Sequence, residues 1–153
     1  MTFYKNLIQL FNSKKATVGI IGMGYVGLPL AILTAKKNFN VYCFERDSNR
    51  YDMLLKKKSY FTNIPTKSLN VFSKKNKFFK KFQKINECDV LIICLPTPLK
   101  NNNPDLSHIV NAIKLLKPQL RKGQLLILES TSYPGTTREE LYEKLKSKFL
   151  IGK

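Results

Sequence analysis

The sequence lacks several features that would place it in other classes of protein. No apolar run approaches the ~20 residues needed to span a bilayer. Residues 1–15 contain no small-residue cleavage site, which argues against a secretory signal and favours a cytoplasmic protein. Three cysteines form an odd set without CxxC or metal-ligand spacing: Cys43, Cys88 and Cys94. They predict buried free thiols in a reducing compartment, with no metal site.

Acidic residues are scarce, 10 against 27 lysines and arginines, and the net charge is +17. Such a charge can indicate nucleic-acid binding. The lysines are scattered among many asparagines, however, which is typical of solvated faces. Residues 74–84 are the densest stretch and interleave lysines with phenylalanines, a pattern that can bind single strands. We favour a short strand and loop with the phenylalanines in the core, so nucleic-acid binding stays the weaker alternative.

The length of 153 residues suits one domain and is short for a complete two-domain enzyme. Apolar residues in residues 1–14 are interrupted by polar ones in a pattern that predicts an amphipathic helix lying on the domain. Residues 15–153 are expected to form that domain.

A glycine-rich turn is the most informative local motif. Gly22, Gly24 and Gly27 follow an apolar run over 17–21 and precede a helical pattern over 25–37. Gly22 would permit a tight turn, Gly24 would let the backbone approach a pyrophosphate, and Gly27 would let the helix sit close to the strand. The helix N-terminus would supply free N–H groups to phosphates. A strand–turn–helix without a ligand is the alternative, but this context favours a dinucleotide site.

An acidic residue stands where a dinucleotide fold places its ribose-binding carboxylate. Glu45 ends a predicted strand over 41–45 and lies 23 positions after Gly22. A carboxylate there accepts the ribose hydroxyls and repels a 2′-phosphate, which favours NAD over NADP. The next residue, Arg46, could instead pair with a 2′-phosphate, stack on the adenine or simply be solvated.

The remaining chain alternates predicted helices and strands, which indicates an α/β fold with a doubly wound parallel sheet. The first expected elements are a helix over 48–57 capped by Asp47, a loop with a short helix over 58–73, a strand near 77–79 and a central strand over 89–95. A helix that opens at 105–107 and is stopped by Pro118, a central strand over 124–128 and a last helix over 137–148 follow. Thr136 and Glu139 have the spacing of a capping box at the start of that last helix. His108 falls in the first turn of its helix, where a solvated residue is favoured over a catalytic base.

Four motifs occur in order along the chain: Gly22–Ala31, Leu95–Leu99, Pro104–Ser107 and Glu129–Thr137. Together they resemble the N-terminal NAD-binding domain of the UDP-glucose/GDP-mannose dehydrogenase family. The turns 95–99 and 133–137 most resemble those of its UDP-N-acetylglucosamine 6-dehydrogenase members. The resemblance implies a Rossmann-type domain.

The resemblance also implies oxidation of a UDP-sugar at C6, from alcohol to carboxylate, with two NAD. In the family, Thr97 and Thr131 close over the nicotinamide side, and Thr131 would have a supporting catalytic role. The residues expected to bind the cofactor are Gly22, Gly24, Tyr25, Val26, Gly27, Glu45, Arg46, Arg50, Pro96, Thr97 and Thr131.

The family's nucleophilic cysteine, its dimer-forming helix and its nucleotide-sugar domain would all lie beyond residue 153. We therefore expect a truncated or split chain that binds NAD weakly and does not turn over substrate alone. A separate C-terminal half or a second copy would be its partner, and a stand-alone nucleotide-binding module is the alternative. Residues 149–151 would begin a further strand, and exposed apolar surface nearby would favour self-association.

Overall fold

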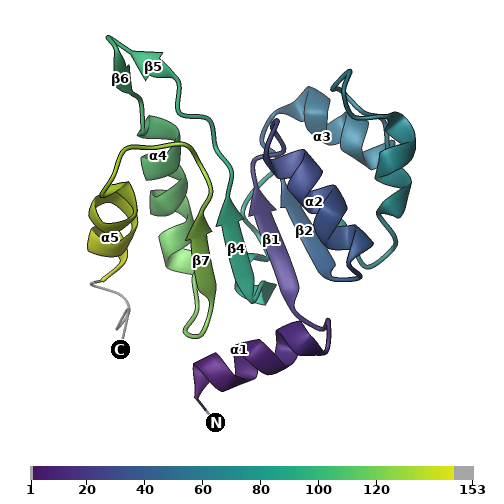
Figure 1. Ribbon diagram of the computed structural model, residues 1–153, viewed down its shortest axis with the longest axis horizontal. Helices are drawn as coiled ribbons and strands as arrows, with labels where there is room; N and C mark the ends of the chain where they lie inside the picture. The colour runs from purple at the N-terminus through teal and green to yellow at the C-terminus, as the bar shows by residue number, and fades with distance from the viewer. Residues whose placement is uncertain (1, 147–153) are drawn as a thin grey trace.

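A five-stranded parallel sheet forms the centre of the computed structural model, which describes residues 2–146 (Figure 1). The strand order is β3-β2-β1-β4-β7, and all four pairings are parallel. The strands are β1 (Thr17–Ile21), β2 (Asn40–Phe44), β3 (Lys77–Phe79), β4 (Val90–Ile93) and β7 (Leu125–Leu128). The predicted doubly wound Rossmann-type fold is confirmed.

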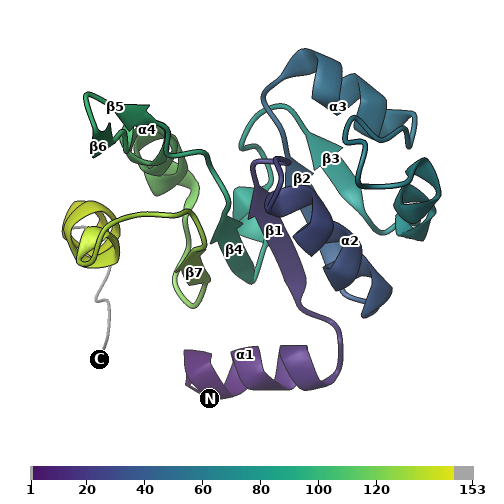
Figure 2. The same ribbon diagram turned by 45° about the horizontal axis from the view of Figure 1, so that its top comes forward.

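Helices cover both faces of this sheet (Figures 1 and 2). The α-helices are α1 (Phe3–Asn12), α2 (Gly27–Lys36), α3 (Ser48–Leu55), α4 (Ser107–Leu116) and α5 (Glu143–Leu145). Short 3₁₀ helices span Thr66–Val71, Ile85–Glu87 and Lys117–Gln119, and a π-helix spans Thr137–Tyr142 directly before α5. Among residues 2–146, no helix is both long enough and apolar enough to cross a bilayer.

Two hydrophobic clusters, one on each face, hold these layers together. Because side chains alternate along a strand, Ile20 of β1 packs with α2 and α3, whereas Ile21 packs with α4 and α5. Both isoleucines are fully buried. The two-sided burial explains why β1 and β4 are almost continuously apolar, as expected for central parallel strands.

Helix α1 lies at the edge of the sheet opposite the carboxyl ends of the strands (Figures 1 and 2). None of its residues is buried, but Leu7 and Phe11 pack against the cluster that contains α2. The Phe11 ring meets Phe39 edge-on, with ring centroids 5.6 Å apart. This helix is therefore attached to the domain by one apolar face.

The structure corrects the predicted position of the last strand. We predicted a central strand over 124–128, but β7 lies at an edge of the sheet within the described residues, and Leu125 is 40% exposed. Its apolar sequence resembles that of a central strand because both of its faces still pack on the core, Ile127 on one cluster and Leu126 and Leu128 on the other.

The predicted capping box is also wrong. The Thr136 hydroxyl donates to the Tyr133 carbonyl at 2.8 Å, and Thr136 makes no side-chain cap. The Glu139 carboxylate lies beside Gly135 instead. The end of the predicted last helix and the strand expected at 149–151 lie outside the described residues.

A small hairpin that was not predicted follows β4. Strands β5 (Leu99–Lys100) and β6 (Asn103–Pro104) pair antiparallel around Asn101 and Asn102, whose φ values are 51° and 61°. Asparagine tolerates this left-handed conformation better than most residues. The hairpin projects beyond the carboxyl ends of the sheet strands (Figure 1).

Candidate functional site: a nucleotide site at the carboxyl ends of the strands

The glycine-rich turn connects β1 to α2, and each of its three glycines has a different geometry. Gly22 has a φ of 90°, and its N–H donates to the Phe44 carbonyl at 2.9 Å. A Cβ on Gly27 would lie 1.8 Å from the Gly22 carbonyl oxygen, so only glycine fits there. A Cβ on Gly24 would meet no described atom within 4 Å. The turn is therefore tight at both ends and open to an approaching ligand in the middle.

Glu45 connects this turn to the end of β2. Its side chain is only 8% exposed. One carboxylate oxygen accepts from the Met23 N–H at 3.1 Å, and the other accepts from the Asp47 N–H at 2.9 Å. A carboxylate has about four lone-pair sites, so acceptor capacity remains for the two hydroxyls of a ribose. Glu45 thus fixes the loop and can bind a sugar.

A segment after α3 holds the glycine-rich turn from its outer side. The Tyr60 hydroxyl donates to the Met23 carbonyl at 2.6 Å. Burial and the charge of Glu45 raise the pKa of Tyr60, so the hydroxyl keeps its proton and remains a donor. The Phe61 ring lies 4.3 Å from the Tyr25 ring. Sequence reasoning missed Tyr60 and Phe61, because no local motif relates them to a loop 37 residues away.

The side chains of Arg46 and Arg50, both predicted to bind the cofactor, lie in different surroundings. Arg46 is exposed and lines a cavity at the strand ends. The Arg50 guanidinium lies over the Tyr60 and Phe61 rings, 5.6 and 5.8 Å from their centroids. Its backbone N–H donates to the Asp47 side chain at 2.8 Å, the predicted N-cap of α3. Arg50 is therefore part of the aromatic support of the turn.

A cavity of about 430 Å³ opens beside Gly22 and Glu45. Its walls come from the carboxyl ends of β1, β2 and β4, the edge at which open α/β sheets bind ligands, and from the start of α4. The lining residues are Ile21, Gly22, Phe44, Glu45, Arg46, Asp47, Phe82, Leu95, His108 and Ala112. His108 is exposed, as expected, but it contributes to this wall.

Thr97 and Thr131 meet where β4 and β7 end. The Thr97 hydroxyl donates to the Thr131 carbonyl at 2.6 Å. One residue earlier, the Ser130 hydroxyl accepts from the Leu95 N–H at 2.9 Å. These two bonds hold the turns together, with Thr131 exposed at the surface. Pro96, Tyr25 and Val26 are exposed as well, and the last two begin the turn into α2.

The three cysteines are free and buried, as predicted. Burial raises the pKa of Cys88 to about 12, with the nearby charges of Asp89 and Glu87 acting in the same direction. Burial and the charge of Glu129 raise the pKa of Cys94 to about 11. Cys43 is fully enclosed, which raises its pKa further. None of these thiols has the lowered pKa of a nucleophile.

The phenylalanines of the lysine-rich stretch pack inward. Phe79 stacks on Phe44 with ring centroids 5.3 Å apart, Phe78 meets Phe72 edge-on at 5.3 Å, and Phe82 is 8% exposed. The interpretation of 74–84 as a strand and loop over the core is confirmed. These rings are therefore not presented for stacking on single-stranded bases.

Comparison with known proteins identifies the family. The description "UDP-glucose/GDP-mannose dehydrogenase family, NAD binding domain" matches residues 16–150, nearly the whole chain. The chain belongs to the UDP-glucose/GDP-mannose dehydrogenase family. Its matched part is the NAD-binding domain, and α1 precedes it.

Curated relatives of this NAD-binding domain are named for two N-acetylated sugars. UDP-N-acetyl-D-glucosamine 6-dehydrogenase from Salmonella typhi is 35% identical over 133 residues, covering 86% of this chain and 31% of the relative. UDP-N-acetyl-D-mannosamine dehydrogenase from Campylobacter jejuni is 36% identical over 124 residues, covering 80% of this chain and 30% of the relative. The chain therefore spans 30–31% of the length of these curated relatives.

Solved structures of two dehydrogenases share this fold. UDP-N-acetyl-mannosamine dehydrogenase from S. aureus superposes with a TM-score of 0.79 at 26% identity, covering 87% of this chain and 32% of that one. NDP-N-acetyl-D-galactosaminuronic acid dehydrogenase from Methanosarcina mazei superposes with a TM-score of 0.78 at 29% identity, covering 92% of this chain and 33% of that one.

Proposed function

We propose that residues 1–153 form the cofactor-binding part of a nucleotide-sugar dehydrogenase that oxidises the C6 alcohol of a UDP-sugar to the uronate. NAD supplies the hydride acceptor for this reaction when it is bound. The observation that carries the proposal is the pair of hydrogen bonds from Met23 and Asp47 to Glu45, which places a buried carboxylate beside the open middle of the glycine-rich turn.

Each part of the site would take one part of the cofactor. The N–H groups at the start of α2 favour the negative charge of a pyrophosphate, and Gly24 leaves room for it. Glu45 would accept from the ribose hydroxyls of the adenosine, whose base would enter the adjoining cavity. Thr97 and Thr131, joined by their hydrogen bond, would flank the nicotinamide end, and Thr131 would support catalysis there.

We propose an N-acetylated UDP-hexosamine as the sugar, with UDP-N-acetylglucosamine as the first candidate. The support is the similarity to enzymes named for this substrate, at 35% and 34% identity over 133 and 128 residues. Relatives named for UDP-N-acetyl-D-mannosamine reach 37% over 131 residues, and they make that sugar the second candidate.

We further propose that these 153 residues bind NAD without producing NADH from a UDP-sugar. Oxidation to a carboxylate by way of a covalent thiol intermediate needs an activated cysteine, and Cys43, Cys88 and Cys94 are buried with raised pKa values. The activated cysteine would therefore have to come from outside residues 1–153. The free thiols suit a reducing compartment such as the cytoplasm.

The test combines calorimetric titration of the 153-residue chain with NAD and an absorbance assay for NADH in the presence of UDP-N-acetylglucosamine. The expected result is saturable NAD binding without steady-state NADH. Absence of NAD binding would contradict the proposed role of the domain. Steady NADH production would contradict the proposal that these residues are inactive alone.

A further inference from the structure

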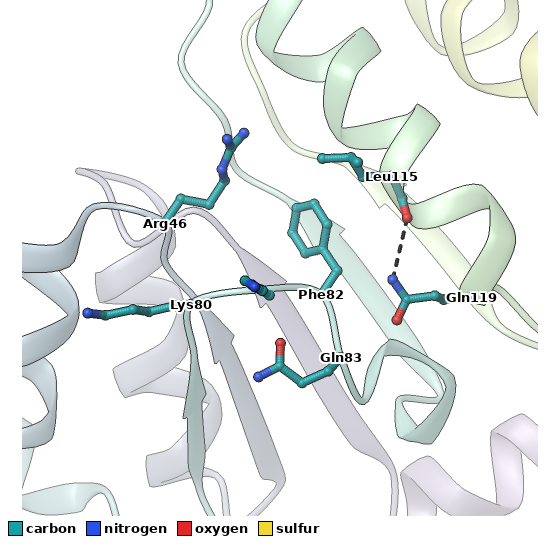
Figure 3. A pocket seen from close by; sticks show the side chains of 7 residues that line it. Arg46, Lys80, Phe82, Gln83, Leu115 and Gln119 are labelled. Carbon is teal, nitrogen blue, oxygen red and sulfur yellow. Dashed lines mark hydrogen bonds between the residues drawn. The ribbon is translucent and has the colours of Figure 1, made fainter.

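A second cavity adjoins the proposed adenosine site. Its volume is about 490 Å³, and it shares Arg46 and Phe82 with the first cavity, so these two side chains form a common wall. Figure 3 shows Arg46 on one side, Gln119, beyond the end of α4, on the other, and Phe82 between them. Gln83 adds a further polar side chain. Arg46 and Phe82 therefore face both cavities.

The charged side chains of this second cavity are all cationic. Arg46, Lys80 and Lys81 line it, and no carboxylate does among the described residues. Lys80 pairs with Asp52 at 3.6 Å and points away from the cavity in Figure 3. Arg46 and Lys81 form no ion pair within residues 2–146. Two positive charges are therefore left to meet a ligand.

Two acids, Glu45 and Asp47, line the first cavity next to Arg46, and both carboxylates already accept backbone N–H groups. The Asp47 carboxylate accepts from the Arg50 N–H at 2.8 Å. Glu45 is 8% exposed, and each of its carboxylate oxygens accepts a backbone N–H. Hydrogen-bond donors stabilise the negative charge of a carboxylate and weaken its repulsion of a second anion. Arg46 is the next residue and is exposed, and an arginine beside the ribose is the group that accommodates a 2′-phosphate.

We propose that the second cavity is a phosphate subsite, so that this domain accepts adenine dinucleotides phosphorylated on the adenosine ribose, such as NADP, in addition to NAD. The proposal rests on the proposed function, because that function puts the adenosine ribose at Glu45. Arg46 binds the phosphate through paired N–H groups, and Lys81 adds a second charge from the loop after β3.

The test compares adenosine 5′-monophosphate with adenosine 2′,5′-bisphosphate by calorimetry on the 153-residue chain, because these probes differ only in the 2′-phosphate. The bisphosphate is expected to bind at least as tightly as the monophosphate, and its advantage is expected to shrink as salt is raised. Lys81→Glu is expected to weaken the bisphosphate about tenfold and the monophosphate less than twofold. Lys74→Glu is the matched control, since Lys74 is exposed in the same stretch and does not line the cavity.

Three results would overturn the subsite. If the monophosphate binds more than tenfold tighter than the bisphosphate, Glu45 excludes the 2′-phosphate while the proposed cofactor function stands. If Lys74→Glu and Lys81→Glu weaken binding of the bisphosphate equally, the bisphosphate responds only to the overall positive charge of the protein and not to a subsite. If neither nucleotide nor NAD binds, both the subsite and the cofactor site are wrong.

Discussion

Replacing Glu45 with glutamine tests the connection between the glycine-rich turn and the ribose site. The carboxylate accepts from the Met23 and Asp47 N–H groups. A glutamine amide has one acceptor oxygen, so one of these two N–H groups would face an NH₂ donor. A hydrogen bond to a charged group contributes about 1.5–3 kcal/mol, so we expect Glu45→Gln to lower the free energy of unfolding by about 2 kcal/mol. For a domain of this size that corresponds to roughly 4–8 °C in Tm.

The same change removes an acceptor for the ribose hydroxyls and loosens Met23. We therefore expect the Kd for NAD to rise at least about tenfold, since each 1.4 kcal/mol changes affinity by that factor. Scanning calorimetry gives the Tm, and titration calorimetry gives the Kd. Glu143→Gln is the control, because Glu143 is exposed and its one ion pair among residues 2–146 is with Lys146, one helical turn away. It is expected to leave both quantities unchanged. A Glu45→Gln protein that melts and binds NAD like the parent would refute the reasoning.

Two further predictions concern the support of the turn and the thiols. Tyr60→Phe removes the donor to the Met23 carbonyl, so we expect about 1 kcal/mol less stability and several-fold weaker NAD binding, measured by thermal melting and titration. Unchanged NAD binding would mean that the aromatic support does not position the turn. Because the pKa of Cys94 is raised to about 11, its thiolate fraction at pH 8 is only about one part in a thousand. Reaction with a disulfide reagent should therefore be slow in the folded protein, speed up as the pH rises toward 11, and become fast in denaturant. A thiol that reacts within seconds at pH 8 in the folded state would contradict this.

Elements with strong local signals were predicted closely. The observed bounds of β1 equal the predicted ones, because its apolar run ends at the glycine-rich turn, and β3 lies where a strand was expected near 77–79. Asp47 caps α3 as predicted, since an aspartate directly before a helix can accept the backbone N–H of the residue three positions later, here Arg50. The first cavity also follows from sequence, because Gly22 and Glu45 lie at adjacent strand ends.

Two of the failed predictions depend on contacts between distant parts of the chain, and two are local. An apolar strand such as β7 has the same pattern at an edge as in the centre when both faces are covered, and only its pairing decides which it is. The Thr136 hydroxyl donates to the Tyr133 carbonyl and does not cap the following helix. Tyr60 reaches Met23 only because the chain after α3 folds back over the turn. The hairpin at Asn101 and Asn102 did carry a local signal, the paired asparagines that tolerate positive φ.

The central claim is that NAD occupies the open space over the glycine-rich turn, and Gly24→Val tests it most directly. A Cβ at Gly24 would meet no described atom within 4 Å outside its chain neighbours, so we expect the variant to fold with the parent's Tm. The valine would fill the space that the pyrophosphate needs. Titration with NAD is expected to show binding weakened at least about a hundredfold, a loss of roughly 2.8 kcal/mol. A Gly24→Val protein that folds normally and binds NAD with the parent's affinity would contradict the account.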